Sequence, residues 1–289
     1  IYYGIFHSIS AFCNAGFDLL GCDTPYMSLT GYSADWLVNL VIMSLIVIGG
    51  LGFIVWDDLS RKGLHFKSYM LHTKIVLLTT LALIFGGALL IGISERDNLM
   101  ADMGWGERIL TSLFASVTAR TAGFNTIDIA SMRPASKLLT IFLMYIGGSP
   151  GSTAGGVKTT TLIVLLLYLG STIRWTHGVN IFGRRLEEDS IMRASCICTI
   201  NLCLALTVAT IILMMQNLDA MDVLLETFSA IGTVGMSSGI TRELNAFSRI
   251  MVILLMYCGR IGSLSFALTF TQNMKLAKVR LPEEKITIG

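Results

Sequence analysis

The apolar run from Leu138 to Trp175 contains a ten-residue interruption that decides the fold of this chain. The interruption reads Gly147-Gly148-Ser149-Pro150-Gly151-Ser152-Thr153-Ala154-Gly155-Gly156. Five glycines and a proline among these ten residues do not continue a helix. Irregular backbone at membrane depth is tolerated only where it is buried in protein or lines a watery cavity. We therefore predict a broken helix, a feature that often marks a permeation site.

The composition excludes a soluble enzyme. Of the 289 residues, 53% are hydrophobic and only 14% are charged, and the mean hydropathy is +0.70. A soluble domain carries roughly 25% charged residues, so this chain has too little polar surface to cover itself in water. The net charge of +2 decides little, because the placement of charge matters more in a membrane. The chain is predicted to be an integral membrane protein.

Further apolar runs fall into two length classes. A helix needs about 20 apolar residues to cross a bilayer. Four continuous runs reach that length: Trp36–Trp56, Lys74–Ser94, Ile191–Met215 and Arg249–Phe270. Three runs are about half as long: Tyr2–Cys13, Ile109–Arg120 and Val223–Ile231. A short run of this kind is either an amphipathic surface helix or a re-entrant half-helix that dips into the membrane and returns as extended chain.

Basic residues predict the orientation of the chain. They gather in the connection 58–73, in the connection 176–190 and its flanks, and in the C-terminal tail 276–289. The members are Arg61, Lys62, Lys67, Lys74, Arg174, Arg184, Arg185, Arg193, Lys275, Lys278, Arg280 and Lys285. By the positive-inside rule these segments are cytoplasmic. The short runs lie in the other connections and share the outer side, which requires each to enter and leave by the same face.

Each short run leads into a similar segment with a central glycine. The segments are Cys13-Asn14-Ala15-Gly16-Phe17, Arg120-Thr121-Ala122-Gly123-Phe124 and Gly232-Thr233-Val234-Gly235-Met236. Their glycines are 107 and 112 residues apart, and each interval holds one outgoing and one incoming span. A fixed period with the same internal order indicates duplicated units. We predict an all-α membrane protein with repeated span, re-entrant half-helix and span pore units, arranged pseudo-symmetrically round a central pore.

A ring of such glycine segments round the pore suits a dehydrated cation. Glycine lets backbone carbonyls approach a ligand closely, and a ring of carbonyl oxygens replaces the water shell of an alkali ion. A half-helix that descends from the outer face also points its electronegative C-terminus inward. The alternative is that the glycines only permit close helix packing, as GxxxG motifs do. That alternative explains three such segments on one side poorly.

The motifs resemble the Trk/Ktr/HKT superfamily of potassium-translocating membrane subunits, and most closely bacterial KtrB. The resemblance rests on Phe12-Cys13-Asn14-Ala15-Gly16-Phe17-Asp18, on the segment from Thr118 to Asn125, on the segment from Gly148 to Thr160, and on Tyr257-Cys258-Gly259-Arg260-Ile261-Gly262. It implies four pore repeats and K⁺ transport through a carbonyl-lined selectivity filter. The filter residues are then Asn14, Ala15, Gly16, Phe17, Thr121, Ala122, Gly123, Phe124, Thr233, Val234, Gly235 and Met236.

The resemblance also implies an order for the repeats. Residues 1–57 would be a truncated second repeat, 72–175 the third and 190–275 the fourth, with the first repeat upstream of Ile1, so that the chain is a fragment. The glycine loop would be a gate under the filter, formed by Gly147, Gly148, Ser149, Gly151, Ser152, Thr153, Gly155 and Gly156 with Lys158 and Arg260. Implied partners are a second copy in a homodimer and a cytosolic nucleotide-binding KtrA-type ring.

Charged residues near the membrane core leave alternatives open. Lys158 and Arg260 lie within apolar runs, where a charge is costly unless it faces a cavity or a partner. Each is either part of the gate or a clamp between helices, and the two roles are compatible. Asp18, Asp128 and Glu226 fall near the outer mouth, either as cation-concentrating charges or as solvated loop carboxylates.

Rival functions fare less well. The loop departs from a phosphate-binding loop because Val157 separates Gly156 from Lys158. A hydrolase built on Ser149 or Ser152 needs a base at the same depth, and no histidine is placed for it. We therefore expect no enzyme, no covalent cofactor and no nucleic-acid partner. A Na⁺- or H⁺-coupled secondary cation transporter in the plasma membrane stays open as the alternative, with K⁺ as cargo and Na⁺ as a coupling ion.

Overall fold

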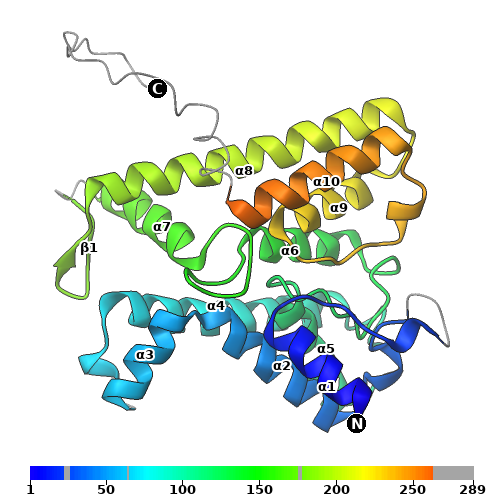
Figure 1. Cartoon of the computed structure of the whole chain (residues 1–289), viewed down its shortest axis with the longest axis horizontal. Helices are drawn as coiled ribbons and strands as arrows, with labels where there is room; N and C mark the ends of the chain where they lie inside the picture. Colours follow the sequence, from blue (N-terminus) through cyan, green and yellow to red (C-terminus); the bar gives the residue numbers. More distant parts are fainter. Residues whose placement is uncertain (23–26, 64, 175–177, 263–289) are drawn as a thin grey trace.

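The computed structural model describes residues 1–22, 27–63, 65–174 and 178–262, and within them the protein is mostly helical (Figure 1). The α-helices are α1 (Tyr2–Phe12), α2 (Trp36–Leu51), α3 (Phe53–Lys62), α4 (Leu71–Ser94), α5 (Trp105–Thr118), α6 (Pro134–Tyr145), α7 (Thr159–Ile173), α8 (Glu188–Met215), α9 (Ala220–Gly232) and α10 (Ala246–Ile261). A two-stranded antiparallel hairpin, β1 (Asn180–Ile181) and β2 (Arg184–Arg185), is the exception to the all-α expectation in the described part.

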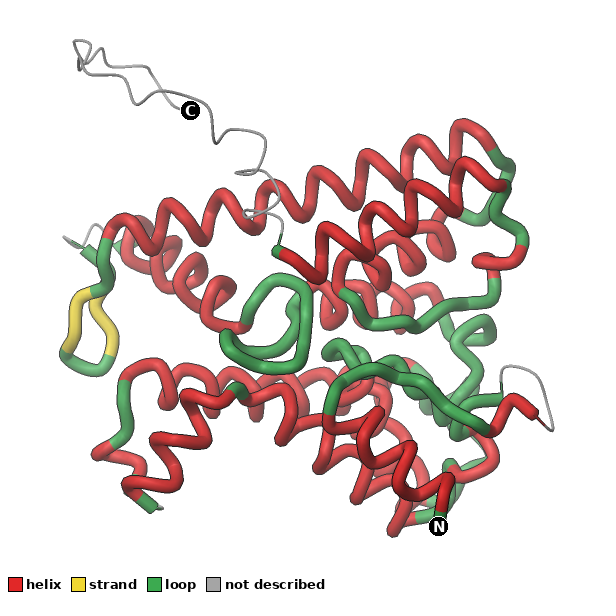
Figure 2. The backbone as a smooth tube through the Cα atoms, viewed as in Figure 1, coloured by secondary structure: helices red, strands yellow, loops and turns green. Residues whose placement is uncertain are grey.

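The expected broken helix is confirmed. Helix α6 ends at Tyr145, α7 begins at Thr159, and residues 146–158 between them are irregular apart from an isolated bridge between Ile146 and Val157. Figure 2 shows this loop in the middle of the molecule, between the layer that holds α1 to α5 and the layer that holds α6 to α10. The glycine-rich segment therefore lies at the centre of the fold.

The first predicted span is not continuous. Helices α2 and α3 meet at Gly52 with a bend of 95°. Gly52 has φ 92° and ψ 147°, a conformation that L-residues with side chains rarely adopt. Helix α3 also carries two acidic and two basic residues, so its sequence suits a membrane boundary better than a membrane interior. The prediction of one helix from Trp36 to Trp56 was wrong because a single glycine ends it.

The last predicted span also ends early. Helix α10 stops at Ile261, and Gly262 follows it with φ 97°, so a continuous helix through this position was a wrong expectation. Residues 263–270 of the predicted span, residues 271–275 of the fourth repeat and the tail 276–289 lie outside the described residues. In the described part, α4 and α8 are each long and apolar enough to cross a membrane, and the bent pair α2–α3 passes the same test as a third.

The three short apolar runs form helices α1, α5 and α9, of 11, 14 and 13 residues. Helix α5 packs against α4, and α9 packs against α6, α8 and α10. Buried side chains such as Phe114 and Phe124 fill the space near α1, α2 and α5, whereas a larger core joins the buried sides of α6, α8, α9 and α10. Helices α5 and α9 are largely enclosed by other helices, so they are not surface helices. Helix α1 packs against α2 and leaves Tyr2, Ile5 and Ile9 more than half exposed.

Apolar side chains cover much of the outside. On α4, Leu81, Phe85 and Leu89 are more than half exposed, and Leu202 and Leu206 of α8 are more than two-fifths exposed. An exposed apolar band of this kind is expected of helices that face lipid. In Figure 1, α3 and the β hairpin lie at one end of the long helices, and the connections that follow α8 and α9 lie at the other end. This arrangement agrees with the predicted alternation of sides, and which end faces the cytoplasm stays a prediction.

Candidate functional site

The three glycine segments share one unusual backbone conformation. Asn14, Thr121 and Thr233 have φ of 50°, 77° and 55°, and the glycines two residues later, Gly16, Gly123 and Gly235, have φ of 69°, 91° and 89°. A positive φ is uncommon for residues other than glycine, so its recurrence at one position of three segments is a property of the repeat. The residue between each such pair, Ala15, Ala122 or Val234, is not among the residues with positive φ, so the three segments share one alternation of backbone conformation.

The segments meet. A methyl group built on Gly16 would lie 3.1 Å from the carbonyl carbon of Ala122, and one on Gly123 would lie 3.3 Å from that of Val234. In both cases the carbonyl oxygen would be closer still, so neither position has room for a side chain. The glycines approach the backbone of the neighbouring segment rather than a neighbouring helix, which differs from the helix-packing alternative. A methyl group on Gly235 would meet no described atom within 4 Å.

Each segment is tied to the C-terminal end of its own short helix. The backbone N–H of Ala15, Ala122 and Val234 donates to Ser10, Thr118 and Ser229 O, at 2.9, 3.0 and 2.9 Å. Side-chain hydroxyls add to this: Ser10 Oγ donates to Phe17 O and Thr118 Oγ1 to Phe124 O, and Ser229 Oγ accepts from Gly235 N–H. We did not identify these hydroxyl residues from the sequence, although one stands at the end of every short apolar run.

Three side-chain oxygens at equivalent positions are left over. Asn14 Oδ1, Thr121 Oγ1 and Thr233 Oγ1 are buried and have no hydrogen-bond partner among the described residues. A buried polar atom of this kind normally finds a partner, because desolvation without one costs about 1–3 kcal/mol. The three residues lie two positions before the central glycines of their segments. Side-chain oxygens without a hydrogen-bond partner among the described residues therefore lie close to where the segments converge.

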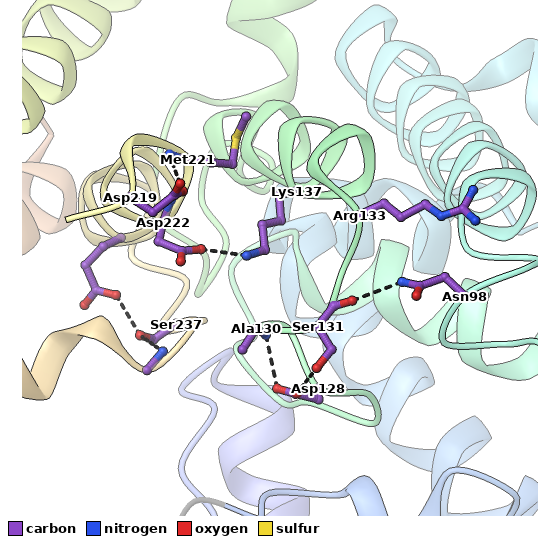
Figure 3. Close-up of polar contacts among 12 residues, drawn as sticks. Asn98, Asp128, Ala130, Ser131, Arg133, Lys137, Asp219, Met221, Asp222 and Ser237 are labelled. Carbon is purple, nitrogen blue, oxygen red and sulfur yellow. Dashed lines mark hydrogen bonds and ion pairs between the residues drawn. The ribbon is translucent and has the colours of Figure 1, made fainter.

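A depression of about 640 Å³ opens above the glycines. Gly16, Gly123 and Gly235 all line it, together with Asp18 and Ser237. Of the three acidic residues expected near a mouth, only Asp18 lies at this depression. Asp128 accepts instead from Ala130 N–H and Ser131 Oγ of its own turn (Figure 3).

Glu226 differs from both alternatives considered for it. It is only 7% exposed, it lies on α9, and its two oxygens accept from Ser237 Oγ at 2.7 Å and Thr241 Oγ1 at 2.6 Å. Glu226 therefore braces the chain that leaves the third segment instead of facing solvent. On the same helix, Asp222 accepts from Lys137 Nζ of α6 at 2.7 Å, an ion pair that joins two predicted repeats (Figure 3).

The large apolar residues after the glycines lie in different surroundings. Phe124 is fully buried and Met236 is 4% exposed, whereas Phe17 is 69% exposed. Phe17 lines a second depression of about 410 Å³, with Met236 and Met256 among the other lining residues. Residues of the first and third segments thus line one depression in the described part of the chain.

The glycine-rich loop contacts the start of all three segments. A methyl group on Gly155 would lie 2.9 Å from Thr233 Cβ, and one on Gly147 would lie 3.2 Å from Thr121 Cγ2. The hydroxyl of Thr153 accepts from Asn14 Nδ2 at 2.8 Å. The expected juxtaposition of the loop and the glycine segments is therefore present in the structure.

The bend at Gly52 provides partners for this loop. Because α2 stops there, the carbonyls of Gly49 and Gly50 are available, and they accept from Thr153 N–H at 3.3 Å and Ser149 N–H at 3.0 Å. The first N–H of α3, that of Phe53, donates to Gly151 O at 3.0 Å. Free backbone groups at helix ends need such partners, so the bend and the loop complete one another.

The two cations predicted to belong to the gate, Lys158 and Arg260, both bind the loop. Lys158 Nζ donates to Ala154 O at 2.6 Å, and Arg260 of α10 donates to Thr153 O at 2.8 Å. Inside the loop, Ser152 Oγ donates to Ser149 O at 2.6 Å, and Ser149 Oγ lies 3.1 Å from Thr159 Oγ1. Both residues therefore hold carbonyls of the loop, and their role in a gate stays a prediction.

Two glycines make close contacts that we did not predict from the sequence. A methyl group on Gly49 would lie 3.0 Å from the carbonyl carbon of Phe12, and one on Gly259 would lie 2.8 Å from that of Ile231. Each therefore lets an outgoing helix touch the end of a short helix. The signal was present: Gly49 and Gly259 each precede the glycine that ends their helix, Gly52 or Gly262, by three residues.

Comparisons with known proteins agree with this picture. A model of the family described as TrkH, cation transport protein, matches residues 1–280. The potassium/sodium uptake protein NtpJ of Enterococcus hirae is 38% identical over 100% of this chain and 64% of its own length. The Ktr system potassium uptake protein B of Bacillus subtilis is 35% identical over 100% of this chain and 64% of its own. The crystal structure of the potassium transporter TrkH from Vibrio parahaemolyticus superposes with a TM-score of 0.74 at 19% identity, covering 94% of this chain and 59% of that one.

Proposed function

Because the chain belongs to the TrkH family of cation transport proteins, we propose that it forms part of a pore that conducts K⁺ across the plasma membrane. Members of this family are ion transporters and not enzymes, in agreement with our expectation. The chain spans less than two thirds of the length of the relatives described above. Substrate, assembly and regulation of the whole protein are therefore part of the proposal.

The observation that carries the proposal is the meeting of three equivalent glycine segments. There is no room for a side chain at Gly16 or Gly123, where the segments touch, so main-chain oxygens are the groups available to a ligand at this point. Each segment follows the C-terminus of a short helix, the electronegative end of its dipole. Carbonyl and hydroxyl oxygens in this field suit a dehydrated alkali cation. Asn14–Phe17, Thr121–Phe124 and Thr233–Met236 are the proposed selectivity filter.

A fourth segment would complete the filter. We assign it to a further repeat of the intact protein, placed between Phe17 and Met236. The open surroundings of Gly235, the exposure of Phe17 and the depression of about 410 Å³ beside Phe17 all support that position. In this scheme residues 1–57, 72–175 and 190–275 are the second, third and fourth repeats.

Residues 147–156 are the proposed gate. They lie directly against the first residues of the filter, and Lys158 and Arg260 hold their carbonyls. A loop with five glycines can change conformation at little steric cost. Deleting part of the loop in the intact transporter should raise the K⁺ flux, and an unchanged flux would remove its gating role.

The assembly follows the family pattern in our proposal. The intact protein pairs as a homodimer, and a cytosolic nucleotide-binding ring of the KtrA type controls the gate. The connections 58–73 and 176–190 and the tail 276–289 then face the cytoplasm. Two Bacillus subtilis relatives are named Ktr system potassium uptake proteins B and D, which supports a multi-component Ktr system.

Coupled transport is the second candidate. The name of the Enterococcus hirae relative includes both potassium and sodium, which favours Na⁺ as a cargo or coupling ion. K⁺ accumulation against its electrochemical gradient, with a fixed Na⁺ or H⁺ stoichiometry in proteoliposomes, would establish the coupled mechanism. K⁺ flux that always follows the electrochemical gradient of K⁺ would exclude coupled transport and favour the channel mechanism.

The filter is tested by replacing its glycines. Gly16→Ser, Gly123→Ser and Gly235→Ser, each in the intact transporter, should lower the K⁺ over Na⁺ permeability ratio. The matched control is Gly86→Ser, because Gly86 lies on α4 and a methyl group there would meet no described atom within 4 Å. An unchanged ratio in all three filter variants would overturn the assignment.

A further inference from the structure

One hydroxyl group connects the loop to the first filter segment. Thr153 Oγ1 donates its single hydrogen toward Phe12 O and Gly49 O, each at 3.1 Å, and accepts from Asn14 Nδ2 at 2.8 Å. Phe12 is the last residue of α1, and Gly49 lies in the last turn of α2. Thr153 O also accepts from Arg260 of α10 at 2.8 Å. A single loop residue thus bonds to a short helix, a filter segment and two outgoing helices.

The contact sets the orientation of the Asn14 amide. The Thr153 hydroxyl and the carbonyl of Ile46, the latter at 3.5 Å, both accept from Asn14 Nδ2. The amide oxygen is consequently turned away from both acceptors, and Oδ1 is buried without a partner among the described residues. An amide rotated by 180° would expose its NH₂ group instead, and an N–H donor repels a cation that an oxygen binds.

The contact also supports an unfavourable backbone conformation. Asn14 has φ 50°, and asparagine tolerates this region better than most residues but at some cost. At Thr121 and Thr233 the loop touches the segments through the glycines Gly147 and Gly155, which carry no hydrogen-bonding side chain. Only at Asn14 does a side chain of the described loop hydrogen-bond to a filter residue.

We propose that Thr153 is a positioning residue for ion selectivity, which holds the Asn14 amide with its oxygen free for the cation while the gate loop is docked. This inference rests on the proposed filter and gate. It adds that selectivity depends on the position of the loop: when the loop leaves, Thr153 leaves with it, and Asn14 is free to rotate. The loop then controls which ion passes as well as how much.

The test uses the intact transporter and two readouts, total K⁺ flux and the K⁺ over Na⁺ permeability ratio. Thr153→Val keeps the shape and removes the hydroxyl, and it should lower the ratio by about tenfold, which corresponds to one lost hydrogen bond. Thr153→Ser keeps the hydroxyl and should retain the ratio within about twofold. Ser152→Ala is the matched control, because the hydrogen bonds of the Ser152 side chain to described residues, Ser149 O and Ala154 N–H, lie inside the loop. It should change flux without changing the ratio.

A double substitution tests whether the effect passes through Asn14. In an Asn14→Ala background, Thr153→Val should change the ratio no further. If Thr153→Val alters flux as Ser152→Ala does and leaves the ratio intact, or if its effect simply adds to that of Asn14→Ala, the inference is overturned. Thr153→Cys, a weaker acceptor, gives a second measurement if the valine variant does not fold, and it should lower the ratio by less than tenfold. Gly123→Ser is measured in parallel to distinguish failure of the proposed filter from failure of the inference about Thr153. An unchanged K⁺ over Na⁺ permeability ratio in Gly123→Ser would contradict the proposed filter and not the role of Thr153.

Discussion

Gly259 offers a stringent test of how the short helices are positioned. In a Gly259→Ala variant, the new methyl group would lie 2.8 Å from the carbonyl carbon of Ile231, 3.1 Å from its Cα, and closer still to its oxygen. Ordinary contact begins near 3.4 Å, so α9 and α10 must separate by more than about half an ångström. The obstacle is backbone, which cannot rotate out of the way as a side chain does.

The magnitude follows from overpacking. Inserting a methyl group into a well-packed interior costs about 1–3 kcal/mol, and the backbone position of the clash places this variant at the upper end. Ile231 precedes Gly235 by four residues, so the displacement of α9 also shifts the third filter segment. We expect both a lower unfolding temperature in detergent and impaired K⁺ uptake in cells that lack other uptake systems.

Gly86→Ala is the control for this experiment, since a methyl group on Gly86 would meet no described atom within 4 Å and alanine favours helix. The reasoning is refuted if Gly259→Ala unfolds at the control temperature and transports K⁺ at the control rate. Loss of transport with unchanged stability would mean that α9 moves without loosening the core, and the filter alone is affected.

Three further predictions follow from the polar contacts. Lys137→Met should destabilise the protein by about 2–4 kcal/mol, because it leaves Asp222, whose side chain is only 20% exposed, without its ion-pair partner. The double variant Lys137→Met/Asp222→Leu should recover part of this loss in thermal unfolding, and a single variant as stable as wild type would contradict the role of the pair. Glu226→Gln should raise the KM for K⁺ uptake severalfold, because an amide offers one acceptor oxygen to the two hydroxyls of Ser237 and Thr241. An unchanged KM would mean that the hydrogen bonds of Glu226 do not affect ion entry. Asp58, in the predicted cytoplasmic connection, has a pKa lowered from 3.8 to about 2, chiefly by its hydrogen bond with Lys62. Its contribution to stability should therefore be complete above about pH 4 and be lost as the pH falls through 2, so Asp58→Asn should differ from wild type in unfolding temperature at pH 6 and converge with it near pH 2.

The parts of the fold that the sequence predicts are those with a strong local signal. Five glycines in ten residues break a helix whatever surrounds them, and the loop 147–156 forms as expected. The short apolar runs are too short to span, and their repetition at a near-constant period predicts a common structural role. Their helices and the meeting of their glycine segments agree with that expectation.

The parts that failed depend on contacts between distant residues. Gly52 looks like a helix-packing glycine within an apolar run. Its φ of 92° at the bend of 95°, and the Pro150 O that would lie 2.5 Å from a methyl group on it, depend on the folded chain. Glu226 finds its partners 11 and 15 residues later, in an irregular segment for which no periodicity exists. Asp128, by contrast, is an exposed loop carboxylate whose partners lie two and three residues away, which agrees with one of the two alternatives predicted for it.

The bend at Gly52 has a consequence for the energy of gating. Ser149 N–H, Thr153 N–H and Gly151 O are paired with the broken ends of α2 and α3, and all of these pairings are lost if the loop swings away. Backbone groups in a dry interior do not stay unpaired, so water has to enter to take over those hydrogen bonds. A permeating ion needs the same water on the inner side of the filter. Entry of water and opening of the loop are therefore one event. Conditions that withdraw water from the inner side of the filter should favour the shut state.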